Sequence, residues 1–116
     1  MPSQAVLVLI SEDPRASHRA NEAMRIALGV VAGDNEVAIV LTGAAAHLLD
    51  EDTDDLVDGD DILKFRAALK KLGVPFHVDA AAPRAPDWNV ESHPVIPIDA
   101  AGIAQLMANA PRVMVF

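Results

Sequence analysis

The sequence predicts a three-layer α/β fold, in which about five parallel strands form one sheet with helices on both faces. Short apolar segments alternate with amphipathic helical segments along its 116 residues, and the links between them are short. The first segment, Ala5 to Ile10, is an unbroken apolar run that ends at turn-forming residues. A run without alternation is typical of a parallel strand buried on both faces. We therefore expect residues 5–10 to be the central strand of a flavodoxin-like sheet.

Composition narrows the class of protein further. Hydrophobic residues make up 52% of the chain and aromatic residues only 3%, so the core is expected to consist of closely packed aliphatic side chains. The net charge of -8 disfavours binding to nucleic acid phosphates and to anionic membranes, and neither partner is predicted. No secretory leader pattern and no membrane-length apolar run is present, so we expect a cytoplasmic protein with a single domain over residues 1–116.

The sequence contains no cysteine. Disulfides, thiolate metal ligands and thiol nucleophiles are therefore excluded within these 116 residues. The four histidines, His18, His47, His77 and His93, do not have the spacing of metal ligands. We accordingly predict no metal, no cofactor and no catalytic residue.

The first half of the chain predicts two strands and two main helices. Asp13 followed by Pro14 predicts a helix start, and small apolar residues at three- and four-residue steps extend that helix to about Gly33. Residues 36–41 predict a second strand, and residues 44–49 predict a short helix at most. The helix predicted over residues 60–72 has Ile62, Phe65, Leu69 and Leu72 facing inward and Lys64, Arg66, Lys70 and Lys71 facing outward.

The segment from Asp50 to Asp61 carries eight carboxylates in twelve residues. Asp50, Asp52 and Asp54 occupy the first, third and fifth positions of a calcium-binding loop. The sixth position, which needs glycine, is Asp55, and the twelfth lacks the bidentate glutamate. We predict a solvated acidic loop whose last carboxylates favour the start of the next helix, with weak calcium binding as the alternative.

The second half of the chain predicts three further strands and one helix. Residues 74–78 predict a strand that delivers Asp79 to the edge of the sheet, and residues 80–92 predict a loop. That loop holds Trp88, the only tryptophan and a predicted interface residue. Residues 95–96 and 112–116 predict the last two strands. Asp99 is predicted to cap the helix between them, which directs Ile103, Leu106, Met107 and Ala110 toward the sheet.

A ligand site, where one exists in an open parallel sheet, lies beyond the carboxyl ends of the strands. The candidate ligand-binding residues at that edge are Ser11, Glu12, Asp13, Thr42 and Asp79. Acids after the first strand would repel the phosphate of a flavin mononucleotide, and glycine-rich nucleotide loops are absent. A phospho-acceptor site would need a lysine after the last strand, and the sequence has none there.

Two stretches resemble the DsrE/DsrF-like family, to which the TusBCD sulfur-relay subunits belong. Residues 72–79, Leu-Gly-Val-Pro-Phe-His-Val-Asp, are similar to the family's Gly-Val-Pro strand. Residues 103–116 are similar to the helix and strand that close the family's domain, and the opening Ser-Glu-Asp-Pro at residues 11–14 also fits. The resemblance implies a DsrE-like fold and assembly with further copies of the chain or with related subunits.

In active members of the family, a cysteine just after the third strand carries persulfide sulfur, and Asp79 occupies the matching position here. A carboxylate cannot accept sulfane sulfur, so the resemblance implies the fold without the sulfur transfer. Two functions remain open. One is a non-catalytic structural or accessory subunit in sulfur-relay-type metabolism. The other is a stand-alone domain that binds a small ligand or a metal through the acidic residues at the strand ends.

Overall fold

A computed structural model describes residues 6–116, so that Ala5 of the predicted first strand lies outside the described residues. The elements are β1 (Val6–Ile10), α1 (Arg19–Ala32), β2 (Val37–Leu41), the 3-10 helix η1 (Gly43–Leu49), α2 (Gly59–Lys71), β3 (Phe76–Asp79), β4 (Val95–Ile98), α3 (Ala100–Asn109) and β5 (Val113–Val115). Their order is the predicted one. No helix within residues 6–116 is long and apolar enough to cross a membrane.

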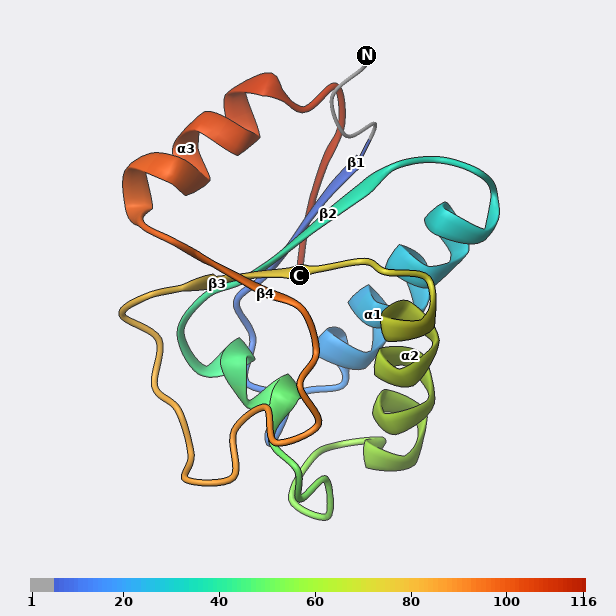
Figure 1. Ribbon diagram of the computed structural model, residues 1–116, viewed down its shortest axis with the longest axis vertical. Coiled ribbons are helices and arrows are strands. Elements are labelled where there is room, and N and C mark those ends of the chain that lie inside the picture. The colour runs from blue at the N-terminus through green and yellow to red at the C-terminus, as the bar shows by residue number, and fades with distance from the viewer. Residues whose placement is uncertain (1–5) are drawn as a thin grey trace.

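The five strands form one parallel sheet in the order β4-β3-β2-β1-β5 (Figure 1). The predicted class of fold is therefore confirmed, but the prediction that residues 5–10 form the central strand is wrong. The centre is β2, whose five residues are all buried. β1 and β2 both read as unbroken apolar runs, because both are interior strands. An unbroken apolar run therefore distinguishes an interior strand from an edge strand, but it cannot identify which interior strand is central.

Helices cover the two faces of the sheet unequally. α1, α2 and η1 pack on the face that carries Ile10, Ile39 and Phe76. Among the described helices, only α3 packs on the opposite face, where Ile103 and Leu106 contact the buried side chains of Leu7, Ala38 and Val40. Figure 1 shows α3 on one side of the strands and α1 and α2 on the other. These three layers confirm the predicted architecture.

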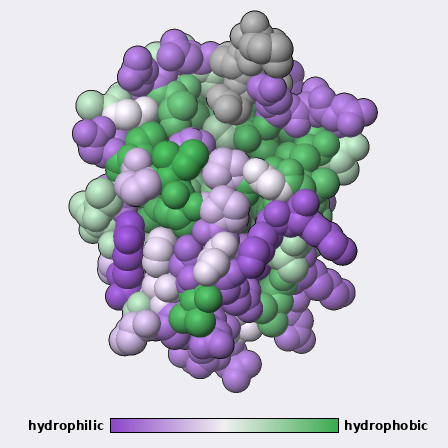
Figure 2. Space-filling model, viewed as in Figure 1, coloured by the Kyte–Doolittle hydropathy of each residue, from purple (hydrophilic) through white to green (hydrophobic). Residues whose placement is uncertain are grey.

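The α3 face of the sheet leaves apolar side chains uncovered. Within residues 6–116, Ile96 on β4 is 45% exposed and Val115 on β5 is 55% exposed. Met107 is also exposed, although it was predicted to face the sheet, because the stripe that contacts the sheet follows Ile103, Leu106 and Ala110. Figure 2 shows hydrophobic side chains gathered over α3.

One predicted helix start is wrong and another is confirmed. Asp13 does not cap α1, which begins at Arg19. The Asp13 carboxylate accepts the backbone N–H of Arg15 and also binds the Arg15 side chain, so it caps only the separate turn over residues 13–17. The hydroxyl of Ser17 accepts the backbone N–H of Arg19 at 3.1 Å, immediately before the helix. Asp99 caps α3 as predicted, since its side chain accepts the backbone N–H of Gly102 at 2.8 Å.

The connection from β3 to β4 is a loop, residues 80–94, where a parallel sheet commonly has a crossover helix. Side-chain and backbone contacts attach this loop to the rest of the domain. The indole N–H of Trp88 donates to the carbonyl of Ala46 at 2.8 Å, and the Arg84 guanidinium lies 4.4 Å from the centre of the Trp88 ring. Trp88 also forms an isolated antiparallel bridge with Asp50. The loop is thereby fixed against η1.

Candidate functional site

Three of the predicted ligand residues come together at the carboxyl edge of the sheet. Ile10 is paired with Leu41, and Leu41 with Val78, so the residues that follow, Ser11, Thr42 and Asp79, lie side by side. Each is the first residue past the buried part of its strand. This is the edge at which ligands of parallel sheets bind.

The polar groups of these three residues already have local partners. The Ser11 hydroxyl donates to the carbonyl of Phe116 at 3.2 Å, and the Thr42 hydroxyl donates to the carbonyl of Ile10 at 3.4 Å. One carboxylate oxygen of Asp79 accepts the backbone N–H of Ala81 at 3.0 Å. A ligand at this edge would therefore contact hydroxyls of Ser11 and Thr42 that already donate to backbone carbonyls. It would also contact the Asp79 carboxylate, which accepts a backbone N–H from the turn that follows β3.

The two acids that follow β1 have different environments. Arg15 binds both oxygens of the Asp13 carboxylate, with Nε 3.0 Å from Oδ1 and Nη2 2.9 Å from Oδ2. Hydrogen bonding to Arg15 lowers the pKa of Asp13, against the opposing effect of partial burial, and the same contact raises the pKa of Arg15. Glu12 is exposed. The charge that Asp13 offers to a cationic ligand is thus largely balanced by Arg15.

A buried arginine lies away from this edge, and the sequence prediction missed it. Arg66 is only 1% exposed, and its Nη1 donates to the carbonyls of Leu48 at 2.9 Å and Asp50 at 2.6 Å. The prediction that Arg66 faces outward is therefore wrong. Position 66 is four residues after Ile62 and three before Leu69, so it lies on the buried stripe of α2. The spacing alone therefore indicates that residue 66 is buried, but the prediction placed Arg66 outward because it is charged.

Asp50, the carbonyl partner of Arg66, is also buried, which corrects the prediction of a wholly solvated acidic loop. Its carboxylate Oδ2 lies 2.8 Å from Nδ1 of His47, within hydrogen-bond distance. Its other oxygen has no hydrogen-bond partner within residues 6–116. Asp50 contacts His47 of η1, three residues before it, and two residues distant in sequence, Arg66 of α2 and Trp88 of the loop. The two distant contacts could not be predicted from the acidic segment alone.

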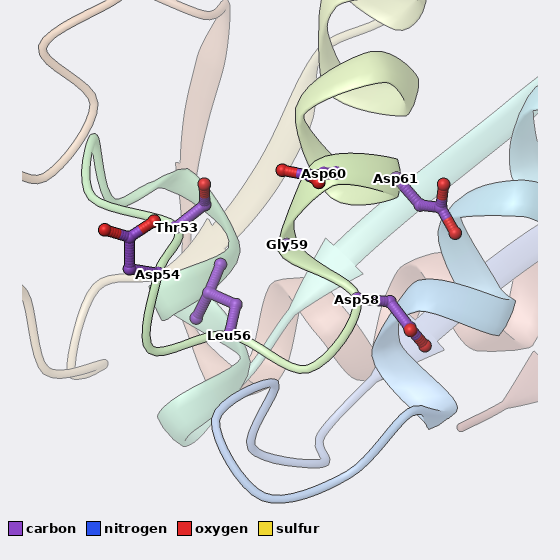
Figure 3. A pocket seen from close by; sticks show the side chains of 7 residues that line it. All are labelled: Thr53, Asp54, Leu56, Asp58, Gly59, Asp60 and Asp61. Carbon is purple, nitrogen blue, oxygen red and sulfur yellow. The ribbon is translucent and has the colours of Figure 1, made fainter.

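The other seven carboxylates of the acidic segment are exposed, as predicted. Four of them, Asp54, Asp58, Asp60 and Asp61, line an open cavity of about 370 Å³ at the start of α2. Figure 3 shows that these side chains point in different directions, with Asp54 and Asp61 turned away from each other. In the described part of the chain, no group of three histidine, cysteine or acidic side chains is placed to hold a metal ion.

A second polar cluster joins α2 to the end of the 80–94 loop. His93 is 4% exposed, packs edge-on to Phe76 at 6.2 Å between ring centres, and has Nε2 3.1 Å from Oε1 of Glu91. Burial lowers the pKa of His93; the Glu91 hydrogen bond opposes this shift, and the charge of Arg66 adds to it. The lowered pKa favours the neutral form of the His93 imidazole.

The fold and the edge site together define a three-layer α/β protein with a flavodoxin-like parallel sheet. The chain belongs to the DsrE/DsrF-like family, whose model matches residues 4–116. The predicted resemblance is thereby confirmed. The crystal structure of the ychN protein from E. coli is similar to this chain, with a TM-score of 0.74 and 15% sequence identity, over 98% of this chain and 100% of the other. No curated protein matches the sequence.

Proposed function

We propose that this chain is a non-catalytic DsrE/DsrF-like protein, a structural or accessory subunit in cytoplasmic sulfur-relay-type metabolism that does not carry persulfide itself. The observation that supports the proposal is the absence of cysteine from all 116 residues, with Asp79 at the strand end where the family resemblance places the sulfur-carrying residue. Persulfide transfer needs a thiolate as nucleophile, and a carboxylate cannot replace it.

Exposure to a sulfur donor should leave the mass of the protein unchanged. After incubation with a cysteine desulfurase and free cysteine, we expect mass spectrometry of the intact chain to show no adduct of about 32 Da, because no thiolate is present to accept the sulfur. A stable adduct of this size on the wild-type chain would contradict the proposal.

The matched control is Asp79→Cys. Asp79 is half-buried at the end of β3, so a thiol introduced there should be alkylated in the folded protein and should gain sulfur from the donor. An introduced thiol that is labelled only after unfolding would show that the position is closed, and would remove Asp79 from the candidate site.

Self-association is a further part of the proposal. Exposed apolar residues flank α3 on both edge strands, Ile96 on β4 and Val115 on β5, and Met107 lies on α3 itself. These residues are candidate contacts for a second copy of the chain or a related subunit, and Trp88 is a second candidate interface residue. We expect sedimentation equilibrium to show a dimer or a larger assembly. A single 12.3 kDa species at high protein concentration would contradict this expectation.

The alternative function is a stand-alone domain that binds a small cationic or metal-linked ligand through Ser11, Glu12, Asp13, Thr42 and Asp79. The strand register that places Ser11, Thr42 and Asp79 side by side favours it. Purification from the native host separates the two functions. A stable partner that carries a reactive cysteine supports the accessory subunit, whereas a homo-oligomer that retains a small ligand supports the alternative.

A further inference from the structure

Arg66 has an unused hydrogen-bonding edge inside the protein. Its Nη1 is bound by two backbone carbonyls, but neither Nε nor Nη2 has a hydrogen-bond partner within residues 6–116, although the side chain is 99% buried. Nε and Nη2 form the side of the guanidinium that binds both oxygens of a carboxylate or phosphate. Buried donors without partners are costly, so an empty edge of this kind points to a missing acceptor.

Glu91 brings a carboxylate close to this edge, but it fits poorly. Its Oε1 lies 3.4 Å from Nη2 of Arg66, which is longer than a normal hydrogen bond between these groups. The same oxygen is closer to Nε2 of His93, at 3.1 Å. The Glu91 side chain is 44% exposed and belongs to the 80–94 loop, so it can turn toward solvent without disturbing a helix or a strand.

A cavity of about 740 Å³ opens beside Glu91, lined by Ala67, Lys70, Lys71, Glu91 and His93. We call it the Arg66 cavity, because Nη2 of Arg66, a residue that does not itself line the cavity, lies 3.4 Å from Oε1 of Glu91 in its wall. The cavity wall holds two lysines and one carboxylate, in a chain whose net charge is -8. Nδ1 of His93 is a further buried nitrogen without a hydrogen-bond partner among the described residues.

We propose that the Arg66 cavity binds a small molecule through an oxyanion, a carboxylate or phosphate group, which occupies the Nε–Nη2 edge of Arg66 while Glu91 turns out to solvent. Lys71 adds positive charge at the cavity wall, and Lys70, whose ammonium donates to the Glu91 carbonyl, keeps the loop in place. His93 directly precedes the residue whose carbonyl receives the first N–H of β3, so the cavity lies near the amino ends of the strands. The proposal is therefore independent of the site at Asp79.

The test is titration of the purified protein with inorganic phosphate and, separately, with succinate, at constant ionic strength and with chloride as the control anion. We expect saturable binding of one or both oxyanions by calorimetry, and the comparison identifies the group that the cavity prefers. Glu91→Gln should tighten that binding about tenfold, because it removes the internal carboxylate that competes for Arg66.

Glu91→Gln also separates a ligand site from a structural ion pair. If Glu91 only stabilises Arg66, the variant melts at a lower temperature and gains no oxyanion affinity, which overturns the proposal. The absence of saturable binding in both the wild type and Glu91→Gln overturns it as well.

Two lysines of α2 provide a matched pair for the role of charge. Lys71 lines the cavity and Lys64 does not, while both are exposed. Lys71→Gln should weaken oxyanion binding about threefold to tenfold, and Lys64→Gln should leave it unchanged. Equal effects of the two substitutions would show general attraction to surface charge and would overturn the proposal.

Discussion

Replacing Arg66 with alanine is expected to lower the free energy of unfolding by about 3 to 5 kcal/mol. The substitution removes the donor shared by the carbonyls of Leu48 and Asp50 and leaves both without that partner. It also empties the space of the largest fully buried side chain in the described residues. Urea denaturation followed by circular dichroism measures the change.

Two further substitutions serve as controls, one on the exposed side of α2 and one at position 66 itself. Lys64→Ala on the exposed side of the same helix should change the stability by less than about 0.5 kcal/mol. Arg66→Met retains much of the apolar volume without the donors, so its difference from Arg66→Ala reports the cavity. A loss of less than about 1 kcal/mol for Arg66→Ala would mean that Arg66 does not hold η1 against α2.

Truncation of Phe76 to alanine should also cost about 3 to 5 kcal/mol. Phe76 is fully buried at the start of β3, where it belongs to the main core and contacts the imidazole of His93 edge-on. The cavity left by the ring cannot be filled easily, because β3 is paired on both sides. Thermal and chemical denaturation measure the loss.

The control for Phe76 is Ile96→Ala on the neighbouring strand. Ile96 is paired next to this region but is largely exposed, so its truncation should cost less than about 1 kcal/mol. Equal losses at the two positions would show that Ile96 is covered in solution, as it would be in an assembly of several chains.

The sequence predicts most of the fold because the signals that define it are local. Unbroken apolar runs identify β1 and β2, and the Asp99 cap identifies the start of α3. The prediction of an element fails where the same local sequence pattern is compatible with two structures. Asp13 before Pro14 resembles a helix cap, but Arg15 binds that carboxylate two residues later, and no helix follows until Arg19.

The polar interior was harder to predict than the strand ends. Strand order alone brings Ser11, Thr42 and Asp79 to one edge, so reasoning from parallel-sheet geometry was sufficient to find them. Arg66 on α2 and His93 in the 80–94 loop both lie close to Glu91 of that loop. The loop has no sequence periodicity, so their proximity could not be predicted from residue spacing. The position of Arg66 on the buried stripe of α2 could have predicted its burial, but its charge was given more weight than its position.

The replacement of a crossover helix by the 80–94 loop has a consequence for local unfolding. A helix is stabilised by a repeating ladder of backbone hydrogen bonds, whereas this loop is held by separate contacts, such as the Trp88 indole on Ala46, the Asn89 amide on the His93 backbone and the Asn89 N–H on the Leu49 carbonyl. Among the described strands β4 pairs with β3 alone, so we expect release of the loop to free that edge strand as well. Backbone amides of the loop and of β4 should then exchange with deuterated water through a shared partial unfolding. Those of β2 should exchange only when the whole sheet unfolds.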